Sequence, residues 1–561
     1  MGTNFYGQLT KALVICIGTL VIIPIIFGFI GFFLPSFGYF PILGKSEFNL
    51  NYFHLSFNIA GISKSIILSL FTGLVSTLLA LFFSQVILLY LFKTRAYNYI
   101  KIIISPLIAL PHITMAIGLI FLFSPSGLFF RLISPWLTGF DRPPNIFIMP
   151  DEYGLFLILG LILKEIPFFI LVSLSALQEF SAKKIFDLGK SLQNSNFSSW
   201  CILIFPLIYK KIRFVIFIVI AFTASVVDMS LILAPSTPST LAIRILQTYQ
   251  SSDADSLFIA SNLALIQLFI IIILLLFWMV LEKIVSYKLS FIFFMKILSF
   301  KTFFIKKIVV LTSVILFFLS ILGIVSSLIW GFSANWYFPN FFPKSLTLDV
   351  FTNFYNENKS IIFISIFISF IVSLISSLLT IIWVELIEIL KIKKIYLEWI
   401  IFIPLFIPQI SFLIGLQSFI IIFDFDSYLL PLIIIQLFYV IPYSFIILAP
   451  SLREIKKEII IVATSLGKNR LQRLLNVKIP IVMSSLLTSF AIGMLVSFSL
   501  YTPVYFFGGG RITTLTVEAL NLALSGSRQD LGVATFFQII IPILILITVA
   551  YLSKKICKWR F

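Results

Sequence analysis

The sequence is poor in the residues that metal sites, disulfide frameworks and aqueous active sites need. Among 561 residues there are three cysteines and two histidines, and only 11% of the residues are charged. Cys16, Cys201 and Cys557 have a spacing that suits no metal site, and none is placed for a disulfide framework. The acidic residues are scattered, without a triad or a pair of catalytic carboxylates. The sequence therefore predicts a protein that is not an enzyme and binds no cofactor of its own.

Apolar residues are abundant instead. Hydrophobic residues make up 60% of the chain, which includes 65 phenylalanines. A soluble protein could not bury such a composition without leaving large apolar areas in water. Runs of about 20 apolar residues can cross the hydrocarbon core of a bilayer. The sequence predicts an all-α membrane protein with about twelve spans, near residues 11–33, 62–92, 102–123, 154–177, 213–233, 257–281, 307–331, 360–388, 397–422, 431–450, 481–503 and 533–553.

The basic residues predict how these spans are oriented. Lys and Arg number 40 against 22 Asp and Glu, which gives a formal net charge of +18. If the chain starts in the cytoplasm, alternation of the spans places 30 of the 40 basic residues on the cytoplasmic side. This positive-inside bias predicts a multi-pass protein with both termini in the cytoplasm. The charge is accounted for by topology, so nucleic-acid binding is not expected. The first apolar run lacks a small-residue cleavage site and is predicted to be a retained helix.

The chain contains an internal repeat. "SKSII" at Ser63 returns as "NKSII" at Asn358, and "PHITMAIG" at Pro111 returns as "PQISFLIG" at Pro408. Further along, each residue of the second copy follows its counterpart in the first by a constant number of residues, the separation between Ser191 and Ser465. We call this separation the repeat offset. At this offset the matching residues are Ser191, Leu192 and Pro206 with Ser465, Leu466 and Pro480. Because the order is the same in both halves, we predict two parallel copies of one six-span module, related by an axis along the membrane normal.

The predicted modules are residues 1–281 and 307–561, joined by the basic linker 282–306. Apolar residues alternate with lysines in this linker. The alternation favours an interfacial helix, and a plain charged connector is the alternative.

Each module carries a patterned segment between its fourth and fifth spans, on the predicted cytoplasmic side. In the second module it reads "TSLGKNRLQRLLNVKIP" from Thr464 to Pro480, and in the first "KSLQNSNFSSWCILIFP" from Lys190 to Pro206. Leucines at helical spacing with basic residues on the other faces predict a short amphipathic helix parallel to the membrane. Gly467 can separate two short helices because glycine reaches backbone angles that other residues avoid.

At these segments the chain resembles the membrane permeases of ATP-binding-cassette (ABC) importers. Their signature in this loop is Glu-Ala-Ala, three residues, Gly, nine residues, and Ile-x-Leu-Pro. The second copy keeps four of its positions, namely Ala463, Gly467, Ile479 and Pro480. The first copy keeps an acid and the proline, with glutamine at the glycine position: Asp187, Pro206 and Gln193. The resemblance covers essentially the whole chain, because both copies occupy the same place in their modules.

The resemblance implies two type I importer modules whose loops dock into a separate cytoplasmic ATPase dimer, which uses the ATP. The expected coupling residues are Asp187, Ser191, Leu192, Gln193 and Pro206, and Ala463, Ser465, Leu466, Gly467, Ile479 and Pro480. Because Gln193 replaces the family's glycine, the two ATPase contacts are expected to be unequal. The chain itself lacks an ATP site: the segment nearest to G-x-x-x-x-G-K-[ST] is Gly38–Ser46, which has one residue too many.

Within the family, the fused modules and "LYTPVYFFGGGRITTLTVEAL" look most like the permeases of the thiamine and ferric-iron group. The segment that begins "SPLIALPHITMAIG" resembles an uncharacterised thiamine-permease-like subgroup. This resemblance implies import of a small molecule or a metal complex across a bacterial inner membrane, with delivery by a periplasmic binding protein. The loop Ser124–Tyr153 is roughly twenty residues longer than its counterpart. It either helps to dock that binding protein or is a plain insertion.

Charged residues inside the predicted spans are candidates for the solute pathway. Lys164 and Glu165 lie near the middle of the fourth span, and Asp228 lies late in the fifth. A charge at this depth usually faces protein or a water-filled path. The alternatives are a structural pairing with another helix for Lys164 and Glu165, and simple solvation for Asp228. His112 is interpreted as a packing residue.

Two other classes of protein share parts of this pattern. An ion-gradient-driven secondary transporter can have the same layout of six plus six spans. The major-facilitator group would show Gly-x-x-x-Asp-Arg-x-Gly-Arg-Arg after its second span, where this chain reads "KTRAYNYIK". A membrane enzyme for lipid-linked sugars would need charged residues converging on an aqueous site, and the acids here are too scattered.

Overall fold

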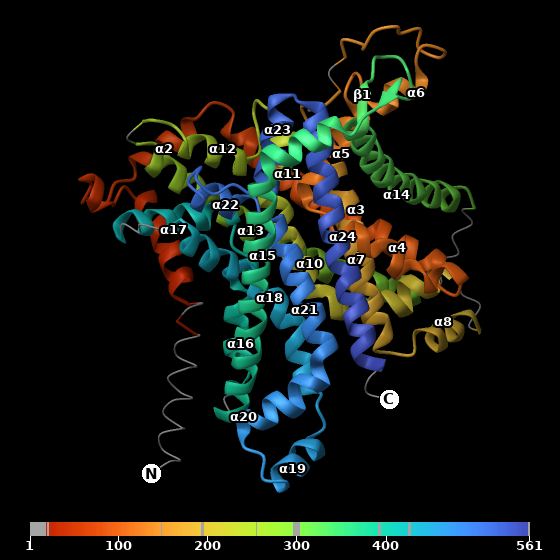
Figure 1. The fold of residues 1–561 in the computed structure, drawn as a ribbon, viewed down its shortest axis with the longest axis vertical. Coiled ribbons are helices and arrows are strands. Elements are labelled where there is room, and N and C mark those ends of the chain that lie inside the picture. Colours follow the sequence, from red (N-terminus) through yellow and green to blue (C-terminus); the bar gives the residue numbers. More distant parts are fainter. Residues whose placement is uncertain are drawn as a thin grey trace.

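The computed structural model describes residues 18–19, 22–146, 148–191, 196–253, 255–294, 303–390, 394–423 and 428–558. These residues form an elongated bundle of helices with one two-stranded antiparallel sheet, β1 (Ser333–Asn335) and β2 (Ser345–Leu346) (Figure 1). The prediction of an all-α, multi-span membrane protein is confirmed.

The elements of the first half follow a helix over Ile22–Ser36. They are η1 (Pro41–Leu43), α2 (Asn51–Asn58), α3 (Ile62–Leu91), η2 (Arg95–Asn98), α4 (Ile100–Ala109), α5 (His112–Phe123), α6 (Leu128–Ile133), α7 (Leu155–Gln178), α8 (Ala182–Ser191), α9 (Asn196–Ser199), η3 (Trp200–Ile204), α10 (Phe205–Ser225), α11 (Asp228–Leu233), α12 (Leu241–Tyr249) and α13 (Ser256–Phe294).

The second half has the same kinds of element. They are α14 (Phe303–Phe332), β1, β2, α15 (Asp349–Leu390), α16 (Lys394–Phe402), η4 (Ile403–Leu405), α17 (Gln409–Phe423), α18 (Leu429–Arg453), α19 (Lys457–Ser465), α20 (Arg470–Arg473), η5 (Leu474–Lys478), α21 (Ile479–Ser499), α22 (Thr502–Phe507), α23 (Leu515–Ser525) and α24 (Arg528–Lys558). Helix α13 extends into the predicted linker as far as Phe294. Residues 295–302 of that linker lie outside the described part of the chain.

Nine helices of the described residues are long and apolar enough to cross a membrane, against about twelve predicted spans. The helices Glu398–Leu405 and Gln409–Ser418 meet at 101° and form either one broken span, which would be the tenth, or a re-entrant loop. Pro408 lies between them and has no N–H to continue the first helix. The predicted span 11–33 lies partly outside the described residues, which include the helix Ile22–Ser36. Helix α10 carries Lys210, Lys211 and Arg213 near its start. Because of these three charges, it is not among the nine helices counted above.

Helix α10 is nevertheless a core helix. Its residues at every fourth position, Ile208, Ile212, Ile216 and Ile220, are fully buried. This spacing places the four side chains along one stripe of the helix. The charged residues therefore occupy the remaining faces near one end while the stripe packs against α3, α7 and α13.

The sequence repeat is also present in the structure. Five elements of the second half follow those of the first at the repeat offset: α20 matches α9, η5 matches η3, α21 begins where α10 begins, α22 matches α11, and α23 begins where α12 begins. The first residues of α12 and α23 make equivalent hydrogen bonds. Leu241 N–H donates to Ser69 Oγ (2.9 Å), and Leu515 N–H donates to Ser365 Oγ (2.8 Å). The boundaries 1–281, 282–306 and 307–561 stay predictions.

Two pairs of glycines interlock the halves. Gly118 on α5 packs against Gly323 on α14, and Gly415 on α17 packs against Gly28 on the helix Ile22–Ser36. A Cβ atom added to Gly415 would lie 1.8 Å from the carbonyl oxygen of Gly28. Small residues allow such close approach of helix backbones in membranes. The first helix of each half therefore packs on the other half, as Figure 1 shows for α14 beside α5.

Candidate coupling loops and a buried polar cluster

The second loop consists of α19, a turn at Gly467, α20 and η5. Gly467 has φ of 75°, and the N–H groups of Gly467 and Lys468 donate to the carbonyls of Thr464 (3.0 Å) and Ala463 (3.2 Å). A left-handed glycine that ends a helix in this way satisfies carbonyls that have no partner inside the helix. Asn469 then starts α20 with a capping box to Gln472. The local sequence therefore accounts for two short helices separated by a turn.

Apolar side chains of this loop are exposed. Relative exposure is 63% for Ile461, 58% for Val462, 74% for Leu466 and 65% for Leu471, while Ala463 is buried. In Figure 1, α19 lies at the far end of the long axis, beyond the ends of the long helices. An exposed apolar surface on a projecting segment is typical of an interaction site.

Lys478 ties this loop to a long helix. Its Nζ lies 2.6 Å from Glu385 and 2.9 Å from Glu388 on α15, and its side chain is only 9% exposed. Pro480 follows in the first turn of α21, directly after the π-helical turn η5. These ion pairs join the end of the loop to α15, and η5 continues directly into α21. The sequence interpretation missed Glu385 and Glu388, although two acids three residues apart inside an apolar run were a signal.

We expect Lys478→Met to lower the free energy of unfolding by about 2 kcal/mol, between the values typical of buried and exposed ion pairs. The substitution leaves two carboxylates close together without their cation. Thermal unfolding of the purified protein in detergent measures the loss. Lys468→Met, at an exposed lysine of the same loop, is the control and should change stability little. Equal losses in the two variants would contradict the role given to the Lys478 contacts.

The first loop is packed against the body of the protein. Phe186 on α8 and Trp200 in η3 are buried, and each ring centroid lies 5.4 Å from that of Phe92 after α3. Burial near this cluster raises the pKa of Tyr97 above its ordinary value. Gly189 allows α8 and α9 to touch, because a Cβ there would lie 2.6 Å from Ser199 Oγ.

The predicted coupling residues of the first loop fall in three places. Asp187 on α8 forms an ion pair with Lys93, and Ser191 Oγ donates to the carbonyl of Leu188 (2.8 Å). Pro206 lies in the first turn of α10. Leu192 and Gln193 lie outside the described residues.

The predicted residues of the second loop form two groups. Ala463, Ser465, Leu466 and Gly467 lie at the end of α19, and Ile479 and Pro480 open α21. The π-helical turn η5 separates the groups, as η3 does before Pro206. Single π-turns inside helices often occur at functional sites.

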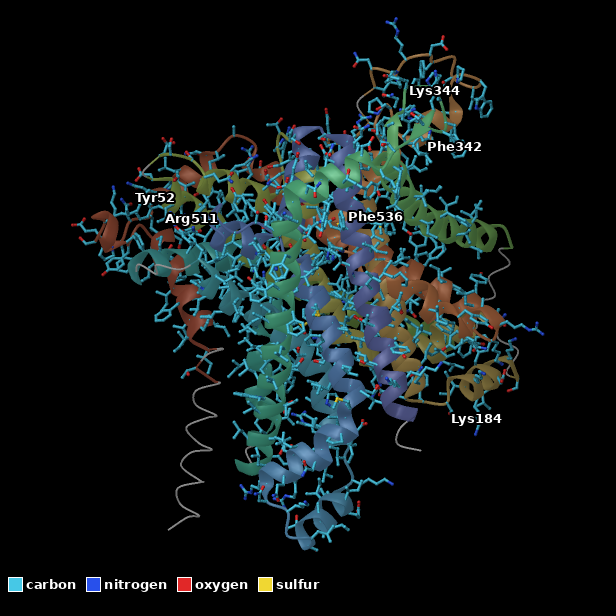
Figure 2. The ribbon with its side chains drawn as sticks, in the orientation of Figure 1. Tyr52, Lys184, Phe342, Lys344, Arg511 and Phe536 are labelled. Atoms are coloured by element: carbon cyan, nitrogen blue, oxygen red, sulfur yellow. The ribbon has the colours of Figure 1, made fainter. Side chains whose placement is uncertain are left out.

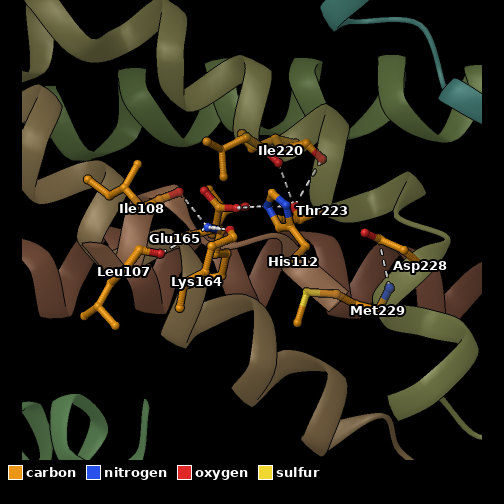
Figure 3. A network of polar contacts seen from close by, with 12 residues as sticks. Leu107, Ile108, His112, Lys164, Glu165, Ile220, Thr223, Asp228 and Met229 are labelled. Atoms are coloured by element: carbon orange, nitrogen blue, oxygen red, sulfur yellow. Dashed lines mark hydrogen bonds and ion pairs between the residues drawn. The ribbon is translucent and has the colours of Figure 1, made fainter. Parts of the chain in front are cut away.

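Lys164 bridges a broken helix rather than another side chain (Figure 3). Its Nζ donates to the carbonyls of Leu107 (3.2 Å), Ile108 (2.9 Å) and Leu110 (2.5 Å). These carbonyls lie where α4 ends before Pro111, which has no N–H to complete the helix. A cation at the C-terminal end of a helix also interacts favourably with the helix dipole. The contacts favour the structural alternative for Lys164.

Glu165 and Asp228 have different surroundings (Figure 3). Glu165 is buried, and its Oε1 lies 3.6 Å from His112 Nε2. Asp228 starts α11 and accepts a hydrogen bond from the N–H of Met229 (2.9 Å). The His112 ring also packs on Phe222, with centroids 4.7 Å apart. A pathway role for Glu165 and Asp228 stays a prediction.

The long loop Ser124–Tyr153 joins the segment after α14 in one cap. Arg131 on α6 donates to the carbonyls of Trp336, Tyr337 and Asn340, and its guanidinium lies 4.4 Å from the ring centroid of Trp336. Figure 2 shows this cap, with Phe342 and Lys344, projecting beyond the helices.

Residues 389–560 match the family described as "Binding-protein-dependent transport system inner membrane component". The matched segment includes the whole second loop and the helices that follow it. This part of the chain is therefore similar to the permease components of binding-protein-dependent transport systems.

A second comparison extends over most of the chain. The chain is 23% identical over 453 residues, 80% of each protein, to the inner membrane ABC transporter permease protein YnjC of Escherichia coli (strain K12). The two comparisons support an ABC importer permease, which is a transport subunit rather than an enzyme, and a multi-pass protein of the inner membrane.

Proposed function

We propose that the chain is the transmembrane permease subunit of a binding-protein-dependent ABC importer, with two fused modules and two loops that couple to a separate ATPase dimer. The observation that carries this proposal is the succession of short helix, π-helical turn and proline-started helix, which occurs twice at the repeat offset. One copy lies inside the matched permease domain. The other occupies the equivalent place in the first half.

In the proposed mechanism, closure of the ATPase dimer on ATP moves the two loops. The displacement passes through η3 and η5 into α10 and α21, and through Lys478 into α15. Because α14 packs on α5 and the helix Ile22–Ser36 packs on α17, movement of one half requires movement of the other. The solute pathway between the halves thus opens to alternate sides of the membrane.

The proposed partners follow from the family resemblance. A periplasmic binding protein delivers a small-molecule or metal-complex solute, and the resemblance to the thiamine and ferric-iron group supports a solute of those kinds. ATP is used by the ATPase, and this chain binds no cofactor and no nucleic acid. The basic residues support an inner-membrane protein whose termini are both cytoplasmic. Glu165 and Asp228 are proposed to line the pathway.

Purification of the protein from its own membranes tests the proposal. We expect an ATPase with an ABC nucleotide-binding sequence to copurify with the wild-type chain, and not with an unrelated membrane protein purified in the same way. Stimulation of its ATP hydrolysis by the permease is the functional readout. If no such ATPase is retained under conditions that preserve known complexes, an ion-gradient-driven transporter becomes the leading hypothesis.

Gly467→Val is expected to lower ATPase retention at least tenfold. Valine is strained at φ of 75°, so the turn between α19 and α20 must change. Gly526→Val is the matched control, because Gly526 ends α23 with φ of 87° and has open space around it, as Gly467 has. The control should retain the ATPase while showing similar backbone strain. Equal retention by both variants, with normal membrane insertion, would contradict a docking role for the Gly467 turn.

A further inference from the structure

We infer that the ATPase is held mainly by the second loop, through an acidic surface of the ATPase, while the first loop is a weaker and more rigid contact. The inference rests on the proposed function, since it concerns how the two loops share the ATPase. The two loops differ in charge, in apolar exposure and in their anchoring to the rest of the chain.

Between residues 467 and 473 the second loop carries three charges at positions where the first loop is neutral. Lys468, Arg470 and Arg473 in the second loop correspond, at the repeat offset, to three neutral residues, Asn194, Asn196 and Ser199. Lys468 and Arg470 are exposed and Arg473 is half-buried. Within the described part of the chain, none of the three has a carboxylate partner, and Arg473 donates to the Thr464 hydroxyl. Three cations with no internal counter-charge fit an acidic partner surface.

The exposed apolar surface is also unequal. Ile461, Val462 and Leu466 each expose most of their apolar side chain to solvent. At the position of Ile461 the first loop has Asp187, which is already paired with Lys93. At the position of Val462 it has Leu188, which is 62% exposed. The counterpart of Leu466 lies outside the described residues, so the described difference in apolar surface is the replacement of Ile461 by Asp187.

The loops differ in their anchoring to the body. Trp200 and Ser199 are almost fully buried, whereas their counterparts Leu474 and Arg473 are partly exposed. In Figure 1, α8 lies beside the bundle and α19 lies beyond its end. A loop that is packed on its own protein moves less when a partner pulls on it. Most of the ATPase displacement therefore enters through the second loop.

Anionic lipid is the other partner that a basic, apolar segment fits. The position of α19 beyond the ends of the long helices favours a protein partner, because a lipid-bound helix lies at the bilayer surface, beside the ends of the spans. Binding measurements in neutral and in anionic lipid separate the two partners.

The test compares two triple variants with the same loss of charge. K468N/R470N/R473S gives the second loop the residues that the first loop has, and K183N/K184S/K190N neutralises three exposed lysines of α8. The ATPase that copurifies from native membranes is identified by its nucleotide-binding sequence and purified. Its Kd for each permease variant is then measured in nanodiscs of neutral lipid, over a range of NaCl concentrations.

We expect the second-loop variant to bind at least tenfold more weakly and to lose most of its salt dependence, because screening acts on the removed charges. The first-loop variant should change the Kd less than twofold. Equal effects of the two variants would overturn the inference while leaving the proposed function intact. An unchanged Kd, with a loss of binding to vesicles containing anionic lipid, would assign the second loop to lipid instead. Absence of any ATPase from wild-type complexes would refute the proposed function itself.

Discussion

Lys164→Met is expected to lower the free energy of unfolding by about 3 kcal/mol, roughly 1 kcal/mol for each carbonyl left without a donor. The ammonium group donates to three backbone carbonyls at the end of α4, and Pro111 cannot supply an N–H in its place. Methionine has a similar length but no donor. The break between α4 and α5 would then contain unpaired polar groups in an apolar surrounding, which is costly.

The effect can be measured by thermal unfolding in detergent and by the yield of folded protein after size-exclusion chromatography. Lys64→Met is the control, because Lys64 is an exposed lysine on α3 and its loss should change stability by less than about 0.5 kcal/mol. Lys164→Arg keeps the donors and should recover part of the lost stability. If Lys164→Met unfolds like the wild type, the carbonyl contacts do not stabilise the break.

Gly415→Leu is expected to destabilise the protein by more than about 3 kcal/mol, at the upper end for overpacked interiors. The Cβ atom alone would lie 1.8 Å from the carbonyl oxygen of Gly28 and 3.1 Å from the backbone nitrogen of Phe32. These are backbone atoms, so no change of rotamer can relieve the clash. The helix Ile22–Ser36 would have to move away from α17.

The equivalent pair gives an internal repeat of this test. Gly118→Leu on α5 meets the backbone of Gly323 at 2.9 Å, so it should destabilise in the same direction by a smaller amount. Ser175→Leu, on an exposed face of α7, adds similar volume and is the control. Limited proteolysis should cut Gly415→Leu faster than the control. A wild-type melting temperature for Gly415→Leu would mean that the first helix does not pack on the opposite half.

Much of the fold follows from patterns that are local in the chain. The length of the apolar runs predicted the α-helical, multi-span class, because crossing a bilayer requires a certain number of residues. The repeat offset predicted which short helices of the two halves correspond. Breaks inside the apolar runs were harder to predict. Residues 102–123 were predicted to be one span, but the structure has two helices there, α4 and α5, which are separated at Pro111. Lys164 contacts the carbonyls at this break. Proline within an apolar run either kinks or breaks a helix, and the choice depends on what satisfies the freed carbonyls.

The candidate site was predictable to a similar extent. The spacing of Ala463, Gly467 and Pro480 located the second loop, because turn and helix-start residues act on their own neighbourhood. The partners of Lys478 and Arg131 were not predicted, since Glu385 and the Trp336 carbonyl lie far away in sequence. Gln193 predicted only that the two ATPase contacts are unequal, and the packing of Phe186 and Trp200 on Phe92 was not predicted.

The sequence by itself determined the membrane class, the repeated organisation and the place of the loops, because hydropathy, spacing and turn-forming residues are encoded in neighbouring positions. Only the tertiary structure decided that the first helix of each half packs on the other half, and that Lys164 completes a broken helix. Both depend on which surfaces meet after folding, and complementary shape between distant backbones leaves little trace in the order of residues along the chain.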